Sequence, residues 1–179
     1  MDSVEEIQGI FDRITERFEE PIPIGGRCES NVFYRVDDLS PEDLNSCAEY
    51  VANRILNVCS PSYPRLFLKL PGGVTSFAER LCGALRDMVP GGQDIEMEQF
   101  VELKLTNGHG PKYRGWESVL VTDVITTARS TLEAHTKVTL QGLNMLCWAS
   151  LIDRTFGPGP VSVVSAFTGA PVRVVTQLG

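Results

Sequence analysis

The sequence predicts an α/β protein with a mostly parallel central sheet and helices on both faces. Short apolar segments rich in β-branched and aromatic residues alternate with segments whose apolar residues recur at helical spacing. The chain has 179 residues, of which 42% are hydrophobic and 22% charged, as in one globular domain. No internal repeat or linker divides it, so we expect a single domain over residues 1–179.

The first third of the chain combines two helical patterns with one strand pattern. Ser3 begins a Ser-x-x-Glu sequence of the kind that caps a helix, and apolar residues then recur at helical spacing. Ser40 followed by Pro41 has the residue order that opens a helix. We expect, in order, a helix over 3 to 19, a turn over 21 to 26, a strand over 31 to 36 and a helix over 40 to 57.

The rest of the chain repeats the order of strand, loop and helix. A short apolar run stops at Pro71, and a second one, beginning at Val119, ends at Asp123; helical spacing follows each of them. We expect, in order, a strand over 66 to 70, a helix over 75 to 88, a strand over 97 to 105, a loop over 106 to 117, a strand from 119 to 123, a helix over 130 to 140, and strands over 144 to 152, 161 to 164 and 172 to 175.

Charge and composition exclude several classes of protein. The 16 Lys and Arg residues against 23 Asp and Glu give a net charge of -7, which argues against nucleic acid as a partner. The five cysteines are scattered without a Cys-x-x-Cys pair, so we expect reduced structural thiols and no zinc site. The N-terminus is acidic, and no apolar run approaches the roughly 18 residues that span a bilayer. We therefore expect a cytoplasmic protein that does not bind membranes.

The segment from Ser118 to Thr131 carries the clearest chemistry. A carboxylate, Asp123, ends a buried strand, and hydroxyl groups follow where a helix begins. Ligands of open α/β sheets lie at the carboxyl ends of the strands, and a helix N-terminus binds phosphate. Asp123 is suited to hold sugar hydroxyls or a magnesium-bound ligand. The alternative is that Ser130 or Thr131 only caps the helix and that Asp123 ends an ordinary strand.

This segment resembles the phosphoribosyl diphosphate (PRPP) signature of the type I phosphoribosyltransferases, which is an apolar strand, two acids, two apolar residues and Thr-x-Gly-Gly-Ser/Thr. Four further segments resemble the orotate phosphoribosyltransferases of that group, in the same order. They are 27–34, similar to the segment near the base; 71–74, similar to the Gly-rich loop at the pyrophosphate; 104–110, similar to the mobile catalytic loop; and 148–154, similar to a late strand ending in Asp-Arg.

The resemblance implies a fold, a reaction and a set of partners. The fold is the α/β fold described above with a small N-terminal hood region. The reaction is transfer of ribose 5-phosphate from PRPP to orotate, a carboxylated pyrimidine, with formation of orotidine 5'-monophosphate and release of pyrophosphate. Mg2+ is the implied cofactor, bridging pyrophosphate and ribose hydroxyls. Family members pair as homodimers, so the resemblance also implies a homodimer.

The resemblance also assigns roles to individual residues. The catalytic residues are Lys104, His109 and Asp123. The PRPP-binding residues are Gly72, Gly73, Asp123, Thr126, Thr127, Ala128, Arg129, Ser130 and Thr131. The base-binding residues are Phe33, Tyr34 and Arg154, the last of which meets the carboxylate of orotate in that family.

The chain departs from the family pattern at several of these positions. Thr122 stands where the first of the two acids is usual, and Arg129 stands where the phosphate loop usually has a small residue. Leu103 and Asn107 replace the family's arginine and second lysine in the catalytic loop. Each lost electrostatic contact removes about 3 kcal/mol of transition-state stabilisation. Two alternatives follow: a weakly active or inactive relative that binds PRPP or a nucleotide as a sensor, and a fold kept only as an interaction module.

Overall fold

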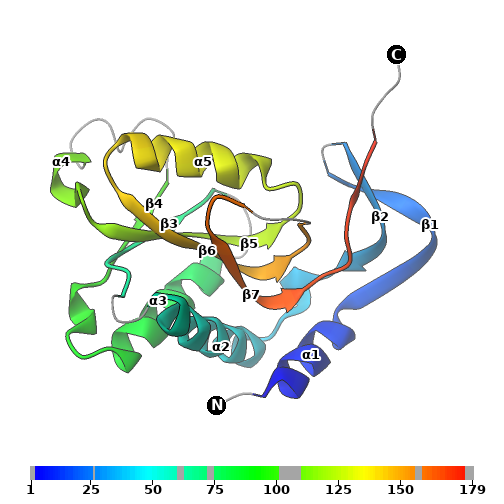
Figure 1. The fold of residues 1–179 in the computed structure, drawn as a ribbon. Coiled ribbons are helices and arrows are strands. Elements are labelled where there is room, and N and C mark those ends of the chain that lie inside the picture. Colours follow the sequence, from blue (N-terminus) through cyan, green and yellow to red (C-terminus); the bar gives the residue numbers. More distant parts are fainter. Residues whose placement is uncertain are drawn as a thin grey trace.

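The computed structural model describes residues 3–25, 27–59, 63–71, 75–100, 110–155 and 159–175, and a five-stranded sheet forms its centre. The strand order is β4-β3-β5-β6-β7, and every neighbouring pair is parallel (Figure 1). The strands are β3 (Leu66–Lys69), β4 (Glu96–Gln99), β5 (Glu117–Ile125), β6 (Asn144–Asp153) and β7 (Ser162–Thr168). The predicted parallel sheet is confirmed.

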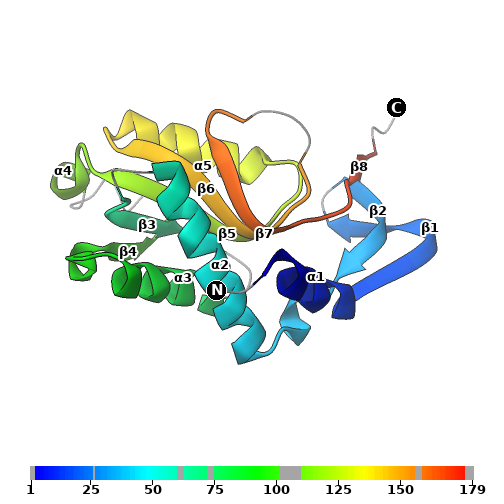
Figure 2. The same ribbon diagram turned by 60° about the horizontal axis from the view of Figure 1, so that its bottom comes forward.

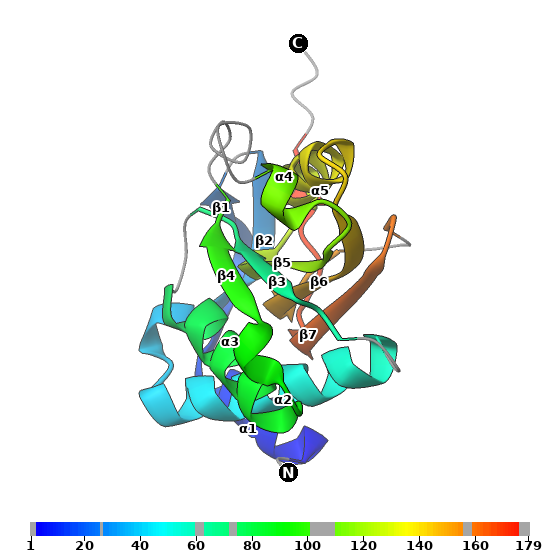
Figure 3. The ribbon, with the colours of Figure 1, turned by 90° about the vertical axis from the view of Figure 1, so that its left-hand side faces the viewer.

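Helices cover both faces of this sheet, as predicted. One face carries α1 (Val4–Arg13), α2 (Pro41–Cys59) and α3 (Thr75–Met88), and the other carries α4 (Gly110–Tyr113) and α5 (Arg129–Leu140), as Figures 1 and 3 show. Each layer encloses its own cluster of buried apolar side chains. The larger cluster lies under α1, α2 and α3, and the smaller one, which contains Trp148, lies under α5.

A second, smaller sheet stands beside the central one (Figure 2) and is called the hood here. It is antiparallel, in the order β1-β2-β8, and consists of β1 (Thr15–Gly25), β2 (Cys28–Tyr34) and β8 (Arg173–Val174). The hood is thus built from both ends of the chain, because β8 returns to pair with β2. Short 3-10 helices occur at η1 (Val36–Asp38) and η2 (Gly92–Asp94).

Two helix starts follow directly from the local sequence. The Ser3 hydroxyl accepts a 3.2 Å hydrogen bond from the Glu6 N–H at the start of α1. At the start of α2, the Ser40 hydroxyl accepts from the Asp43 N–H at 3.0 Å, while the Asp43 carboxylate accepts from the Ser40 N–H at 3.2 Å. These reciprocal bonds satisfy N–H groups that a helix end leaves unpaired, so the predicted caps are confirmed.

The predicted helix over 3 to 19 is wrong from residue 14 onward, and the predicted turn over 21 to 26 is wrong over residues 21 to 25. The helix α1 ends at Arg13, and β1 runs from Thr15 through both prolines to Gly25. Prolines are tolerated in this strand because β1 is an edge of the hood, and its pairing with β2 shifts register between Arg17 and Ile22 and again after Pro23. Pairing with β2 therefore overrides the helical spacing that ran on to residue 18.

Three further boundaries differ from the prediction. The segment predicted as a loop over 106 to 117 contains α4, and β5 continues to Ile125, so Asp123 lies inside the strand and not at its end. The helix α5 begins at Arg129, and its cap, Ala128, makes no side-chain capping bond. Capping by Ser130 or Thr131 is therefore wrong. Residues 101–105 of the strand predicted over 97 to 105 lie outside the described residues.

No helix among the residues that the structure describes is long and apolar enough to span a membrane.

Candidate functional site

The loop between β5 and α5 has an unusual backbone. Ala128 has φ 60° and ψ 4°, the left-handed conformation, and is the one residue other than glycine with a positive φ in the described part of the chain. This conformation costs an L-residue about 1–2 kcal/mol. The Ala128 carbonyl accepts the Leu132 N–H at 2.8 Å, so the strained residue directly starts α5. Strain of this kind gathers at ligand sites, where it fixes the direction of backbone groups.

Two cavities flank this loop. The first, of about 410 Å³, is lined by Thr126, Thr127 and Ala128 of the loop and by Arg154 beyond the end of β6. Its remaining wall is largely apolar and includes Leu132, Trp148, Val163, Val172 and Val174. One cationic group among apolar side chains is the usual composition of a site for a small aromatic ligand.

The second cavity, of about 720 Å³, lies between the same loop and the hood. Thr126 and Thr127 line it as well, together with Arg129 of α5 and Arg27, which precedes β2. Both arginine side chains are exposed, and Arg129 makes a 3.1 Å ion pair with Glu133 across one helical turn. An exposed ion pair of this kind contributes under about 1 kcal/mol to stability, so the Arg129 guanidinium can leave Glu133 and bind an anionic ligand instead.

Three of the residues predicted to bind PRPP lie apart from these two cavities. Ser130 lines a third cavity, of about 440 Å³, together with Thr122 and one side of α5. Thr131 is buried at 2% exposure, and Asp123 is buried at 8% within β5. The structure therefore brings Thr126, Thr127, Ala128 and Arg129 together at the two cavities. Of the other predicted residues, Ser130 lies at the third cavity, and Thr131 and Asp123 lie in the core.

The three predicted base-binding residues differ in burial and in contacts. Arg154 is 4% exposed and donates hydrogen bonds to the Ala170 carbonyl, the Ser30 hydroxyl and the Val32 carbonyl. Burial lowers the pKa of its guanidinium relative to the ordinary value, and the three acceptors replace the lost water. Its Cζ lies 5.1 Å from the centre of the Tyr34 ring.

Tyr34 is held by the same junction, whereas Phe33 is not. The Tyr34 hydroxyl accepts a 2.6 Å hydrogen bond from the Ala170 N–H, and its ring meets Phe167 edge to face at 5.7 Å. Because successive side chains of a strand point to opposite faces, Phe33 lies on the other face of β2, where it is 39% exposed. Arg154 and Tyr34 therefore join the hood to the central sheet, and Phe33 offers an aromatic surface outside this junction.

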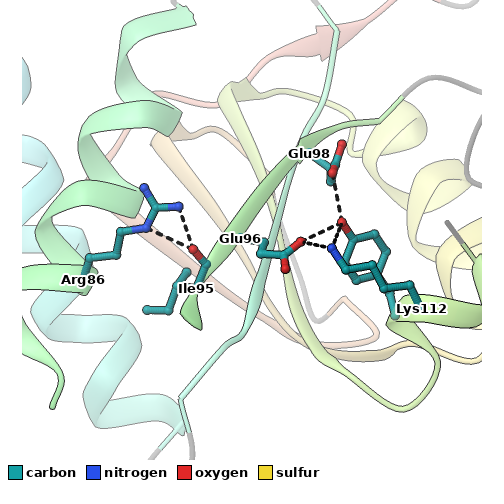
Figure 4. Close-up of polar contacts among 6 residues, drawn as sticks. Arg86, Ile95, Glu96, Glu98 and Lys112 are labelled. Carbon is teal, nitrogen blue, oxygen red and sulfur yellow. Dashed lines mark hydrogen bonds and ion pairs between the residues drawn. The ribbon is translucent and has the colours of Figure 1, made fainter. Parts of the chain in front are cut away.

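The remaining predicted residues, Gly72, Gly73, Lys104 and His109, lie outside the described residues. The elements on either side of segment 101–109 are described, and a cluster of polar side chains joins them (Figure 4). The Tyr113 hydroxyl of α4 lies 2.8 Å from Glu96 Oε2 and 2.9 Å from Glu98 Oε1, and Lys112 Nζ lies 2.7 Å from Glu96 Oε2. Two hydrogen bonds from Arg86 to the Ile95 carbonyl, of 3.0 and 2.6 Å, fix the start of β4.

This cluster shifts the pKa of two of its members. Hydrogen bonds from Lys112 and then from Tyr113 lower the pKa of Glu96. Burial, followed by the hydrogen bonds to the two carboxylates, raises the pKa of Tyr113. Tyr113 therefore stays protonated and acts as a donor, and it holds α4 against the edge strand β4.

Sequence reasoning missed Arg27 and Trp148 as lining residues. Arg27 directly follows Gly25 and Gly26, and a basic residue after a glycine pair next to a strand was the available signal. Trp148 is a buried residue of β6 at 2% exposure, as the strand pattern predicts, but it also lines the first cavity. Its Nε1–H donates to His135 Nδ1 at 3.2 Å, and no sequence pattern pairs those two residues.

No protein-family model matches the sequence, and no curated protein matches it. Solved structures do match the fold. The orotate phosphoribosyltransferase of Mycobacterium tuberculosis H37Rv has a TM-score of 0.64 at 15% identity, covering 92% of this chain and 95% of that one. The orotate phosphoribosyltransferase of Aeropyrum pernix has a TM-score of 0.60 at 19% identity, covering 92% of each chain.

A purine enzyme matches over a smaller part of the chain. The HGPRT-ase of Leishmania tarentolae, solved with GMP, has a TM-score of 0.59 at 16% identity and covers 72% of this chain and 78% of that one. The chain therefore has the fold of the type I phosphoribosyltransferases, as the sequence motifs predicted. The orotate enzymes match a larger share of it than the purine enzyme does.

Proposed function

We propose that this protein transfers ribose 5-phosphate from PRPP to a nucleobase, with orotate as the first candidate. The observation that carries the proposal is the position of the Thr126–Thr127 loop. It lies at the carboxyl end of β5, with two arginines, Arg27 and Arg129, on one side and Arg154 on the other. Anionic sugar phosphates bind at this edge of open α/β sheets, and an aromatic base fits the apolar cavity beside it.

The 5-phosphate end of PRPP belongs in the cavity between the loop and the hood. Thr126 and Thr127 offer hydroxyl groups there, and Arg27 and Arg129 offer guanidinium forks that match phosphate oxygens. Ala128, Ser130 and Thr131 contribute through the backbone N–H groups at the start of α5. Asp123 is assigned to the ribose hydroxyls.

The diphosphate end belongs over Gly72, Gly73, Lys104 and His109. The base nitrogen loses its proton to water and forms a bond to the anomeric carbon of the ribose, while the bond from that carbon to the diphosphate breaks and the diphosphate leaves with the electron pair. Lys104 and His109 would hold the leaving group by charge and hydrogen bonding. Mg2+ prefers oxygen ligands, so Asp123, the carboxylate of this segment, would help to hold it together with oxygens of the substrate. When bound, it would supply positive charge that offsets the charge on the leaving group.

The base belongs in the cavity that Arg154 lines. Tyr34 would act from the hood by holding Arg154 and Ala170 in place, whereas Phe33 would act only from the exposed face of β2, outside the lining of that cavity. Orotate is preferred because the two orotate enzymes cover 92% of this chain and the purine enzyme covers 72%. Arg154 supplies the positive charge that a carboxylated pyrimidine requires.

The test is pyrophosphate release and nucleotide formation from PRPP, Mg2+ and a panel of orotate, uracil, adenine and hypoxanthine. The expected result is turnover with orotate and less with the other three bases. Turnover with a purine base alone would replace orotate, and absence of turnover with all four would contradict the proposed transfer.

A second candidate function is binding of PRPP or a nucleotide without turnover. Two observations favour it: Thr122 replaces one of the usual two acids and lines a different cavity, and Asp123 is only 8% exposed. Both reduce the carboxylate charge available to the ribose and the metal. Saturable calorimetric binding of PRPP in a preparation without turnover would select this candidate, and steady-state nucleotide formation would exclude it.

We also propose a homodimer, on the basis of the family resemblance. Sedimentation at micromolar concentration should then give a species of twice the 19.7 kDa chain mass. A species of single-chain mass alone would contradict it.

A further inference from the structure

The buried Arg154 has most of its hydrogen-bonding capacity committed within the protein. Its Nε donates to the Ala170 carbonyl at 2.6 Å, and its Nη2 donates to the Ser30 hydroxyl at 2.6 Å and the Val32 carbonyl at 3.0 Å. A guanidinium has five N–H groups. The one on Nε and the two on Nη2 are therefore used, and the two that remain are both on Nη1, which has no hydrogen-bond partner within the described residues.

This distribution decides how Arg154 can bind an anion. A two-pronged contact with a carboxylate needs one N–H from each of two neighbouring nitrogens, either Nη1 with Nη2 or Nε with Nη2. Both arrangements use Nη2, whose hydrogens already bind Ser30 and Val32. Arg154 also lines the cavity of about 410 Å³. The guanidinium therefore offers that cavity one nitrogen and not a fork.

The orientation of Arg154 is set by groups that are themselves fixed. Ser30 is 5% exposed, and its hydroxyl also accepts the Val32 N–H at 3.0 Å, so it is bound on two sides. The Tyr34 ring lies 5.1 Å from the Arg154 Cζ, and its hydroxyl holds Ala170 in place through a 2.6 Å bond. Ser30 is the side-chain acceptor in this arrangement, so a substitution there removes the contact without changing the backbone.

We propose that Arg154 presents a single nitrogen, Nη1, to the base and binds one acceptor oxygen of it, and that Ser30 is the positioning residue that sets this geometry. The inference rests on the proposed function and narrows its substrate class. The site takes a base with one oxygen acceptor at this place, either a carbonyl or one oxygen of a carboxylate, and a second carboxylate oxygen is not required.

The first test compares orotate with its carboxamide, which keeps one carbonyl oxygen and lacks the charged second oxygen. The measured quantity is KM for the base in steady-state transfer or, without turnover, the calorimetric Kd. We expect the carboxamide value to rise by less than about tenfold, because only one charged hydrogen bond becomes neutral. A rise above about 100-fold would indicate a two-pronged contact and overturn the inference alone. Binding of neither compound would overturn this inference together with the base assignment.

The second test uses Ser30→Ala, with Ser30→Thr to keep the hydroxyl and Ser162→Ala, at an exposed position of β7, as the matched control. We expect Ser30→Ala to raise KM for the base by about tenfold, with kcat and KM for PRPP within about twofold, and Ser30→Thr to restore the base KM. A lower thermal stability with an unchanged base KM would mean a structural role only and would overturn the positioning role.

A third measurement decides the geometry even if the protein has no activity. In 15N-edited NMR spectra, with Arg154→Lys to assign the signals, the Nε and Nη2 protons of Arg154 should exchange slowly with water. Ser30→Ala should accelerate exchange at Nη2. Fast exchange at Nη2 in the unaltered protein would overturn the inference, whereas slow exchange without turnover would count against the proposed function alone.

Discussion

The Ser30 hydroxyl accepts a 2.6 Å hydrogen bond from Arg154 Nη2, across 124 positions of the sequence. This contact joins β2 of the hood to the residue that follows β6 of the central sheet. The hood and the central sheet therefore meet at the place where two cavities border the Thr126–Thr127 loop. Changes at this junction should alter both stability and ligand binding.

Gly169 is required by the packing at this junction. A Cβ at this position would lie 2.8 Å from Ile152 Cγ2 and 3.0 Å from both Arg154 Cγ and Tyr34 Cε2. We expect Gly169→Ala to lower the free energy of unfolding by about 1–3 kcal/mol, measured in urea, through overpacking. Gly83→Ala in α3 is the control, because an added Cβ there would meet no heavy atom within 4 Å beyond its chain neighbours and the backbone of its own helix. That variant should gain about 0.5–1 kcal/mol, and equal effects of the two would contradict the packing.

Ala128 should tolerate glycine better than any helical alanine does. Its φ of 60° is strained for alanine but not for glycine. Glycine relieves about 1–2 kcal/mol of backbone strain, but its larger conformational entropy in the unfolded chain offsets part of this gain. The Ala128→Gly variant should therefore have a free energy of unfolding between unchanged and about 1 kcal/mol higher. The buried Ala134 of α5 provides the comparison, since Ala134→Gly should lose about 1 kcal/mol or more. Equal losses at both positions in urea unfolding would refute the strained conformation.

The Tyr113 hydroxyl should contribute more to stability than the nearby ion pair. Removing it in Tyr113→Phe leaves Glu96 and Glu98 without their shared donor, at a cost of about 1–3 kcal/mol. Lys112→Met removes the half-exposed ion pair with Glu96 and should cost under about 1 kcal/mol. Chemical denaturation of both variants measures the difference, and a larger loss in Lys112→Met would reverse the assignment.

The stability of the protein should fall in mild acid because of His135. Burial lowers the pKa of His135, and its neutral Nδ1 accepts the Trp148 N–H at 3.2 Å. The unfolded chain then binds the proton more readily, so the stability contributed by neutral His135 is fully present above an unfolded pKa of about 6.5 and is lost as the pH falls below it.

The unaltered protein and His135→Phe, unfolded in urea at pH 7.5 and pH 5, provide the measurement. The phenylalanine variant should lose less stability between the two pH values, and its tryptophan fluorescence should change less. Identical pH dependence in the two proteins would exclude His135 as the cause.

The sequence predicted most of the fold because most elements depend on local pattern. The helix α3 was predicted with its observed bounds, Thr75–Met88, and α2 within two residues of its end, since apolar spacing and the Ser40 cap are local signals. The strand β1 was not predicted, because it depends on pairing with β2 and not on a local pattern. The prolines within it are also residues typical of turns.

The candidate site was predicted in part for the same reason. The motif predicted that the loop after β5 lies at the site. It did not predict which residues face the cavities, because that depends on the side of α5 on which each lies: Ser130 faces the third cavity and Thr131 the core. The three partners of Arg154 also come from distant segments, and only the folded chain brings Ser30 and Ala170 to it.

Calorimetric binding of PRPP with Mg2+ tests most directly the claim that the loop after β5 binds a sugar phosphate. The comparison is between the unaltered protein, Arg129→Ala, and Arg17→Ala at an exposed arginine of β1. The account predicts saturable binding that Arg129→Ala weakens by about tenfold or more and that Arg17→Ala leaves unchanged. No binding by the unaltered protein, or equal weakening by both substitutions, would contradict it.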